Sequence, residues 1–374
     1  MRPQIAGELR TIDRLMTITS SAFAAGVLLS HRLWYAPDRL YPLAPVISSM
    51  RVPDWIDLAL LIALLVALMF VALRQQTVLM ARVAVVITAL FVLLDQSRLQ
   101  PWVYEYCLLL LVLSFSDRAG ALMTCRLIVI ALYFWSAMQK MNVTFITHTW
   151  PDMSAAFPAA AHVGWIAPML ELAIAIGLLV ARFRRIAVIL AIAMHASILV
   201  LLLLARENSV VWPWNIAMAA LTFLLFRRTN ASAAAITWGH RSSSHAVLAV
   251  VAGLLPVMTF VELWDSYLSA ALYSGNTIQS IVLVRPDSIS RLPALIRENT
   301  WQQSQPMFID INRWSYDELN VPAYPARRVM KSVGATLCRT WTPTGVFRIL
   351  GRPRWSDGVR DSESWACRAN RAAR

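Results

Sequence analysis

The chain has 374 residues, 58% of them hydrophobic, and its mean hydropathy is +0.56. A soluble domain of this length would not be so apolar, so the composition indicates a polytopic helical membrane protein with a polar C-terminal tail. The net charge of +13 does not indicate nucleic-acid binding, because the arginines lie mostly in short loops and in the tail, without a basic stripe interleaved with aromatic residues.

Nine apolar stretches approach the roughly 20 residues that a helix needs to cross a bilayer. They lie at about 13–33, 55–73, 79–97, 101–116, 124–141, 166–181, 185–205, 211–227 and 245–263. In the first stretch, Ala22-Phe23-Ala24 resembles a signal-peptide cleavage site, but the acidic Glu8 and Asp13 before it and the apolar residues after it predict a retained helix. We therefore expect an all-α bundle of about nine transmembrane helices over residues 1–270.

Lys and Arg are enriched in the short loops on the cytoplasmic side of a membrane, and this bias orients the chain. With the N-terminus inside, 13 of these residues lie in inner segments and 6 in outer ones. The inner set is Arg2, Arg10, Arg14, Arg74, Arg82, Arg118, Arg126, Arg182, Arg184, Arg185, Arg227, Arg228 and Arg241, and the outer set is Arg32, Arg39, Arg51, Arg98, Lys140 and Arg206. The bias predicts a multi-pass protein of the cytoplasmic membrane with a cytoplasmic N-terminus and, after nine spans, an extracytoplasmic tail. The tail is itself basic, but long domains translocate largely regardless of charge.

The tail, residues 271–374, reads as a small α+β domain. Residues 277–284, 307–311 and 346–350 are predicted strands, 315–319 a capped helical turn and 326–338 an amphipathic helix. Cys338 and Cys367 are the cysteines of the tail, and they can pair if the tail lies outside the cytoplasm. Cys107 and Cys125 lie in or next to spans and are predicted to be buried as small apolar residues.

Lys140 stands at the end of the fifth apolar stretch. The chain has two lysines, Lys140 and Lys331, and Lys140 is the one among the spans. A desolvated lysine amine can lose its proton, whereas a guanidinium effectively cannot. Lys140 is therefore either a candidate general base or an anchor whose amine reaches the membrane interface.

Several acidic residues share the outer depth of the bundle with Lys140. They are Asp95, Glu105, Glu171, Glu207 and Glu262. Charged groups inside a membrane usually face the bundle interior, so one interpretation is an outward-opening polar cavity around Lys140. The other is that these acids pair with Arg98, Arg206 or Lys140 and hold helices together.

Other residue types add weaker indications. His195, near the middle of the seventh span, is either a helix–helix hydrogen-bonding residue or a ligand. Trp102, Trp212 and Trp214 either form an interfacial aromatic belt or stack on a flat ligand such as a quinone. The sequence has no metal-ligand spacing and no nucleotide-binding or hydrolase motif, so no metal is expected.

Three motifs resemble the HTTM superfamily, whose membrane domain is shared with vitamin K-dependent gamma-carboxylase. They are Asp95-Gln-Ser-Arg-Leu-Gln-Pro-Trp102-Val-Tyr104-Glu-Tyr106, then Ser136-Ala-Met-Gln-Lys140, and then His195 with Val211-Trp-Pro-Trp214. The resemblance covers roughly residues 10–270. Nine spans with an extracytoplasmic tail also resemble the carboxylase arrangement.

The resemblance implies a quinone-linked enzyme. In the carboxylase the corresponding lysine deprotonates vitamin K hydroquinone, so Lys140 would be the general base, with Asp95, Glu171 and His195 as further catalytic candidates. Trp102, Tyr104, Tyr106, Trp212 and Trp214 are the candidates for binding a quinone or hydroquinone. Trp102 stands where the carboxylase has a functional histidine, and the tail is far shorter than the carboxylase's luminal region, so full glutamate carboxylation is not expected.

Two other functions are compatible with the sequence. In the first, the bundle is a non-catalytic anchor and the tail binds another envelope protein. The second is a transporter. Two observations disfavour it: the sequence has no internal repeat, and Pro256 in the ninth span predicts a single kink rather than a pair of broken helices at matching positions.

Overall fold

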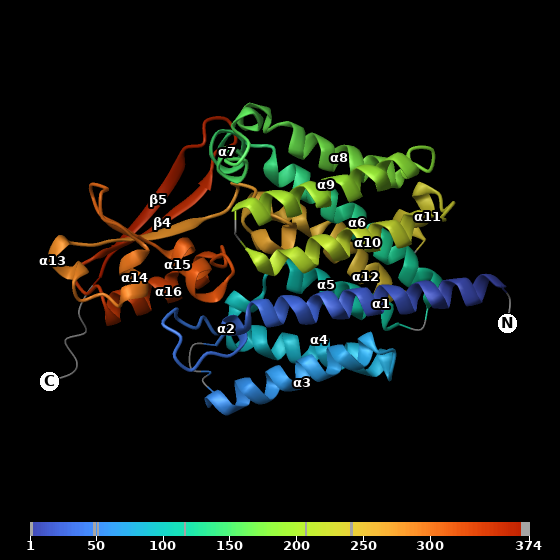
Figure 1. The fold of residues 1–374 in the computed structure, drawn as a ribbon, viewed down its shortest axis with the longest axis horizontal. Coiled ribbons are helices and arrows are strands. Elements are labelled where there is room, and N and C mark those ends of the chain that lie inside the picture. The colour runs from blue at the N-terminus through green and yellow to red at the C-terminus, as the bar shows by residue number, and fades with distance from the viewer. Residues whose placement is uncertain are drawn as a thin grey trace.

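The computed structural model describes residues 3–47, 50, 52–115, 117–205, 208–239 and 242–367. The chain forms a bundle of helices with a sheet and its covering helices at one end, and the N-terminus lies at the other end (Figure 1). The model therefore agrees with the predicted mostly helical fold that ends in a small region containing a sheet.

Within the described residues, seven helices are long and apolar enough to cross a membrane. They are α1 (Pro3–Leu29), α3 (Asp54–Ala72), α4 (Thr77–Leu94), α6 (Arg118–Lys140), α9 (Arg184–Ala205), α10 (Trp212–Phe226) with the preceding turn η4 (Ser209–Val211), and α12 (Ser243–Gly253) continued by η5 (Leu255–Val261). Two apolar helices are shorter, α5 (Pro101–Leu113) and α8 (Ile166–Leu179). The prediction of a mostly helical fold with several helices able to span a membrane is confirmed at this level.

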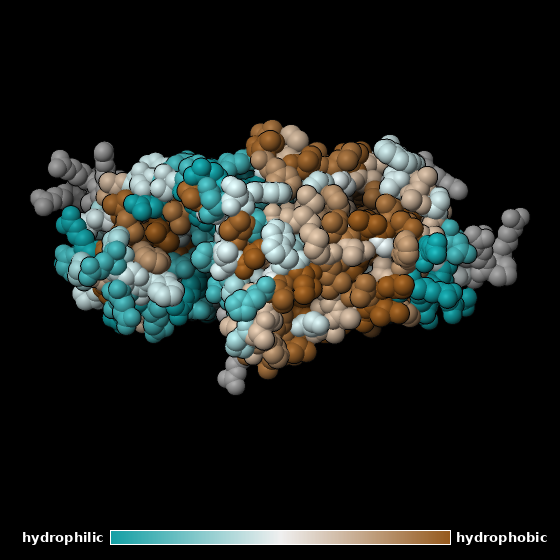
Figure 2. Space-filling view, turned by 90° about the horizontal axis from the view of Figure 1, so that it is seen from above, coloured by the Kyte–Doolittle hydropathy of each residue, from teal (hydrophilic) through white to brown (hydrophobic). Residues whose placement is uncertain are grey.

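Apolar side chains cover the outside of the bundle. Ile62, Ile186 and Ile189 are each more than half exposed. Figure 2 shows hydrophobic residues over the helical part, with hydrophilic residues over the sheet end and over the opposite end. A soluble protein rarely exposes so large a continuous apolar surface, whereas lipid tails solvate it.

Helix α6 is the centre of the bundle. It packs against α5, α8, α10 and α12, and two thirds of its apolar window is buried. Its Lys140 end faces the sheet region, because Asn142 just beyond it donates to the Ser274 carbonyl at 2.9 Å. The polar end of α6 is therefore enclosed by protein.

Two details of the predicted spans can be checked directly. Phe23, inside the apparent cleavage site, is fully buried within α1, which continues to Leu29, so this segment is a helix of the bundle. The ninth stretch changes from α12 to the tighter η5 after Gly253, with Pro256 near the start of η5. Proline has no backbone N–H for an α-helical bond, which accounts for the change at this point.

Short elements connect the long helices. They are α2 (His31–Trp34), η1 (Gln96–Arg98), the π-helical turn η2 (Phe145–Thr149), α7 (Trp150–Met153), η3 (Pro158–Val163), α11 (Ala233–Trp238) and η6 (Ser266–Ser269). The segment from η2 to η3 lies at the sheet end of the bundle, beside α8 and α9 (Figure 1).

The C-terminal region holds a five-stranded antiparallel sheet in the order β2-β3-β1-β4-β5. The strands are β1 (Gln279–Leu283), β2 (Thr300–Trp301), β3 (Phe308–Asp310), β4 (Val346–Pro353) and β5 (Arg360–Ala366), and the helices are α13 (Pro286–Ile289), α14 (Ala294–Glu298), α15 (Ile311–Leu319) and α16 (Arg327–Thr340). The predicted strands at 277–284, 307–311 and 346–350 and the helix at 326–338 correspond to β1, β3, β4 and α16.

The core of this region lies between α16 and the sheet. Val282 of β1, which pairs with Phe347 of β4, is buried. Gly334 lets α16 approach closely, because a Cβ there would overlap the Phe347 ring. Cys338 of α16 is joined by a disulfide to Cys367, directly after β5, as the sequence allowed. The disulfide therefore fixes the edge strand to the helix that covers the sheet.

The sheet region is bonded to the bundle at several points. The Glu318 carboxylate of α15 accepts from the backbone N–H groups of Leu40 and Tyr41 at 2.5 and 2.8 Å, and from Trp314 Nε1 at 2.9 Å. Gln100 donates to the Pro322 carbonyl at 3.1 Å. The Glu318 bonds fix the loop between α2 and α3 against the C-terminal region, and the Gln100 bond fixes the start of α5 against it.

A second joint is the ion pair between Asp265 and Arg328. Arg328 contacts both carboxylate oxygens, and the Tyr324 hydroxyl donates to the same carboxylate at 2.8 Å. Burial alone would raise the pKa of the Asp265 carboxyl, but the bonds from Arg328 and Tyr324 outweigh burial and hold that pKa below its ordinary value. Asp265 is therefore an anion that ties α16 to the end of the bundle.

Candidate functional site

Three polar side chains of α6 lie on one face of the helix near its C-terminal end. Tyr133, Ser136 and Lys140 are spaced three and four residues apart, which places them along one side of a helix. All three line the same cavity. The apolar run of α6 therefore presents a polar stripe to the interior of the bundle.

Lys140 pairs with one carboxylate. Its Nζ lies 2.8 and 3.0 Å from the two carboxylate oxygens of Glu171 on α8, and it also donates to Ser136 Oγ. Both charged side chains are nearly buried, with 11% of Lys140 and 8% of Glu171 exposed. The amine therefore points into the protein, which excludes the interpretation of Lys140 as an anchor that reaches the membrane interface.

A second polar chain connects three helices beside this pair. The Tyr133 hydroxyl lies 2.9 Å from His195 Nε2 on α9 and 3.1 Å from Thr222 Oγ1 on α10. His195 Nδ1 lies 2.8 Å from Asn215 Oδ1, and Asn215 Nδ2 donates to the Val211 carbonyl.

These bonds assign the histidine tautomer. Asn215 Oδ1 can only accept, so the hydrogen of a neutral His195 ring lies on Nδ1 and Nε2 accepts from the Tyr133 hydroxyl. His195 is thus a helix–helix hydrogen-bonding residue that also lines the cavity.

The cavity has a volume of about 280 Å³. It is lined by α6, η2, α7, α8, α9 and α10, and by Ala270, Leu272 and Tyr273. Apolar side chains such as Leu132, Leu170 and Met194 form most of its wall. Ile166 of α8, which also lines it, is 58% exposed on the outer surface of the bundle. The cavity therefore opens at the apolar surface of the bundle, beside α8.

Trp214 provides an unused donor in this cavity. The indole lines the cavity, and its Nε1 is buried without a hydrogen-bond partner among the described residues. A buried N–H left unpaired costs free energy unless a bound molecule accepts from it. Trp212 is partly buried and is not among the residues that line the cavity, so the two tryptophans do not form one stacking surface there.

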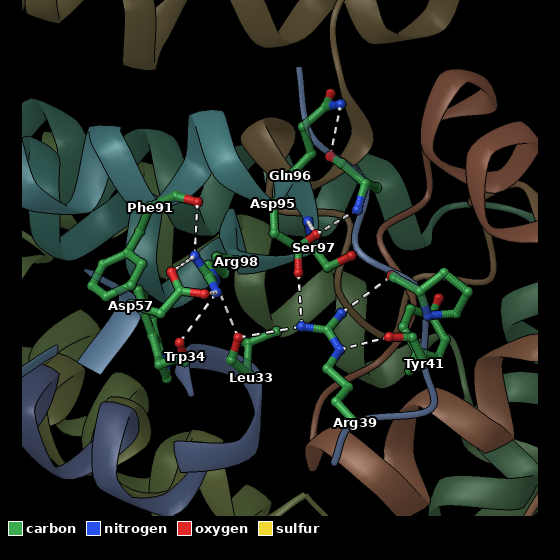
Figure 3. Close-up of polar contacts among 12 residues, drawn as sticks. Leu33, Trp34, Arg39, Tyr41, Asp57, Phe91, Asp95, Gln96, Ser97 and Arg98 are labelled. Carbon is green, nitrogen blue, oxygen red and sulfur yellow. Dashed lines mark hydrogen bonds and ion pairs between the residues drawn. The ribbon is translucent and has the colours of Figure 1, made fainter. Parts of the chain in front are cut away.

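The expectation that several acids gather around Lys140 is wrong for Asp95. Arg39 Nη1 lies 2.8 Å from Asp95 Oδ2, and Asp95 Oδ1 accepts from the backbone N–H groups of Ala44 and Ser97 at 3.2 and 3.0 Å (Figure 3). Asp95 is fully buried and does not line the Lys140 cavity. It fixes the loop that follows Arg39 to the end of α4.

Arg98 forms the other half of this cluster. It donates to the carbonyls of Leu33 and Trp34 at 3.1 Å and to both carboxylate oxygens of Asp57 at 3.3 Å, and it stacks on the Phe91 ring (Figure 3). These ion pairs hold elements of the bundle together, as the second interpretation expected, but the partners differ from it, because Asp95 pairs with Arg39 and Arg98 pairs with Asp57.

Glu105 and the aromatic residues of the Tyr-Glu-Tyr motif lie outside the Lys140 cavity. Glu105 and Tyr104 line a separate cavity of about 30 Å³, which Leu132 and Ala270 divide from the larger one. Trp102 and Tyr106 belong to an aromatic cluster with Phe23 and Trp34 in the interior between α1, α2 and α5. The structure therefore does not bring Trp102, Tyr104 and Tyr106 to Lys140.

The remaining outer acids are also separate from Lys140. Glu262 pairs with Arg327 of α16 at 3.2 Å. Glu207 lies outside the described residues. Across the described part of the chain, no group of three or more His, Cys, Asp or Glu side chains is arranged to hold a metal ion. Of the predicted outer acids that the structure describes, Glu171 is therefore the one that contacts the Lys140 amine.

Sequence reasoning missed Tyr133, Asn215 and Thr222 as cavity or near-cavity residues. Tyr133 was detectable, because it precedes Lys140 by seven residues and so lies on the same helix face. Asn215 directly follows Val211-Trp-Pro-Trp214, and a buried amide in a span is expected to bond across helices. Thr222 had no distinguishing signal, since threonine is common in apolar helices.

Comparisons with protein-family models, with curated proteins and with solved structures found no match.

Proposed function

We propose that this protein is a membrane enzyme that binds a lipophilic hydroquinone in the Lys140 cavity and removes a phenolic proton from it, as the resemblance to the HTTM superfamily implies. The main support is the Lys140–Glu171 pair, which lines an apolar cavity together with the unpaired Trp214 Nε1. An apolar pocket with a few convergent polar groups is the usual form of a small-molecule site.

The cavity fits a ring-sized molecule. At about 280 Å³ it lies near the lower end of the roughly 300–1,000 Å³ of typical ligand pockets. A ring between apolar walls would place an oxygen near Trp214 Nε1, and a long apolar substituent would leave through the surface near Ile166. A hydroquinone supplies two weakly acidic hydroxyl groups and the capacity to be oxidised.

The Lys140–Glu171 pair acts as a unit in proton transfer. The pair has no net charge, either as ammonium and carboxylate or, after the Lys140 proton moves to Glu171, as amine and carboxylic acid. In the second form the lone pair of Lys140 Nζ accepts the phenolic proton. After transfer the pair holds an ammonium and a carboxylic acid, and the ammonium stabilises the phenolate oxygen that has lost the proton. Ser136 Oγ and the two carboxylate oxygens hold the amine in place.

Replacing Lys140 by arginine tests the base. Arginine keeps the positive charge beside Glu171, but it cannot serve as a neutral base. We expect Lys140→Arg to lower the rate of hydroquinone deprotonation or oxidation by about 10²–10⁴-fold, the usual contribution of a general base. Reduced naphthoquinone and benzoquinone serve as probes, followed by absorbance and by oxygen consumption with protein in detergent.

Lys331→Arg is the matched control, because Lys331 is half exposed on α16 and lies far from the cavity in the sequence and in the fold. Both variants must show the melting temperature of the unmodified protein. Mass spectrometry of co-extracted lipids is expected to find a quinone with the unmodified protein. Equal rates for the two variants, or the absence of any bound ring compound and of hydroquinone binding, would favour the non-catalytic anchor.

We also propose nine membrane spans, with the C-terminal region outside the cytoplasm. Among the described residues, the two shorter apolar helices α5 and α8 would bring the seven longer apolar helices to nine spans. The excess of arginine in the loops at the N-terminal end and the Cys338–Cys367 disulfide support this orientation, because disulfides persist in oxidising compartments.

Reporter fusions test the orientation. Alkaline phosphatase fused after residue 374 is expected to be active, since it needs export to form its disulfides, while a fluorescent protein at that position is expected to be dark. The same two reporters inserted after Thr229, at the other end of the bundle, should give the reverse pattern. A fluorescent fusion at residue 374 would reverse the proposed topology.

A further inference from the structure

A basic pocket lies at the end of the bundle opposite the sheet, between the start of α1, the start of α6 and the end of α10. Its volume is about 620 Å³. Five arginines line it, namely Arg10, Arg14, Arg126, Arg227 and Arg228. Glu8 is the acid among its lining residues, so the wall has four more positive than negative side chains. This pocket is far from the Lys140 site along α6.

The arginines of the pocket are available for an anion. Arg10, Arg14, Arg227 and Arg228 are exposed. In the described part of the chain, none of these four guanidinium groups forms an ion pair. The fifth, Arg126, is buried and donates Nε to the Leu225 carbonyl at 2.9 Å, which fixes its position in the pocket wall without neutralising it.

Buried bonds also fix the loop that carries part of the pocket. Arg184 is almost fully buried and donates to the carbonyls of Thr229 and Ala231 at 2.9 and 3.0 Å. It also donates to the carbonyls of Leu178 and Leu179 at the end of α8. The loop after α10 is therefore held in place, so Arg227 and Arg228 project from a defined backbone.

An apolar groove continues from the basic pocket along the outside of the bundle. The groove has a volume of about 270 Å³ and lies between α1 and α10, where Ile18, Ala220 and Phe223 line it. Arg14 and Leu224 line both the groove and the basic pocket. Arg227 of the basic pocket stacks over the ring of Phe223 in the groove, with its guanidinium carbon 4.9 Å from the ring centre. A cation therefore lies at the boundary between the basic pocket and the apolar groove.

We propose that these two adjoining hollows bind an anionic phospholipid, with its phosphate headgroup among the arginines and an acyl chain in the groove. Arginine recognises phosphate through paired N–H donors, and basic pockets at the ends of membrane helices bind anionic lipid headgroups. A soluble phosphate compound would use the basic pocket but would leave the apolar groove unexplained. The proposal does not depend on the function of the Lys140 cavity.

The test compares two double variants of equal charge. Arg227→Gln with Arg228→Gln removes two pocket arginines, and Arg182→Gln with Arg185→Gln removes two exposed arginines at the same end of the bundle that do not line the pocket. Each full-length protein is reconstituted into vesicles of equal parts phosphatidylglycerol and phosphatidylcholine, extracted in mild detergent and examined by native mass spectrometry.

We expect the unmodified protein and the Arg182/Arg185 variant to retain phosphatidylglycerol in preference to phosphatidylcholine. We expect the Arg227/Arg228 variant to retain at least tenfold less phosphatidylglycerol. We expect millimolar inorganic phosphate to displace little lipid from the unmodified protein. Equal loss in both variants would mean a general surface-charge effect and would overturn the proposal. Displacement by phosphate alone would also overturn it, because the site would then bind a soluble anion.

Discussion

Replacing Glu171 by alanine is expected to destabilise the bundle by about 3–5 kcal/mol, the usual result of removing one partner of a buried ion pair. Among the described residues, the substitution leaves the nearly buried Lys140 amine with Ser136 Oγ as its remaining hydrogen-bond partner. The measurement is reversible unfolding of the purified protein in mixed micelles, monitored by tryptophan fluorescence.

Two controls separate the ion pair from simple truncation. Glu262→Ala removes a half-exposed carboxylate that pairs with Arg327, and it is expected to change stability by about 1 kcal/mol or less. Combining Glu171→Leu with Lys140→Met removes both charges and should recover part of the lost stability. If Glu171→Ala were no more destabilising than Glu262→Ala, the cavity would be open to water and the proposed proton transfer would lose its apolar setting.

Replacing Asp95 by alanine is expected to have an effect of similar size, about 3–5 kcal/mol. Asp95 is completely buried, and its loss leaves the Arg39 guanidinium without its carboxylate and the N–H groups of Ala44 and Ser97 without their acceptor. Since Asp95 lies outside the Lys140 cavity, hydroquinone turnover per folded molecule should be unchanged.

Asp38→Ala is the comparison, because Asp38 lies beside Arg39 in the loop after α2 but is 72% exposed and pairs with Arg32. It should leave the unfolding midpoint almost unchanged. A folded Asp95→Ala protein of normal stability that had lost turnover would return Asp95 to the list of catalytic residues and contradict its structural role.

Hydropathy predicted the helical part of the fold well, because the lipid requires about 20 apolar residues for each span. The C-terminal strands were predicted less completely. Strand β4 alternates between partly exposed and buried residues, so its start was found, whereas β5 is an edge strand whose residues Arg360–Ala366 are mostly exposed and carry no alternating pattern. Strand β2 has two residues, too few for a periodic signal.

For the candidate site, the sequence predicted how deep each side chain lies along its helix, but it did not predict which side chains meet. Counting residues along each span gives the depth of a side chain, and Asp95, Lys140 and Glu171 were correctly assigned to the same end of the bundle as judged by the direction of their helices. Depth does not tell which way a helix is turned about its axis or which helices are neighbours. Asp95 therefore meets Arg39, while Glu171 on α8 meets Lys140 on α6.

The contact between Glu318 and the loop after α2 also has a consequence for biosynthesis. The carboxylate that accepts from the Tyr41 backbone N–H is 277 residues further along the chain. At a synthesis rate of about 5–20 residues per second, roughly 14–55 seconds pass before that acceptor is made. During this interval the loop after α2 lacks the Glu318 carboxylate that holds it in the folded protein. A chain that stops before α15 therefore leaves this loop open to proteases.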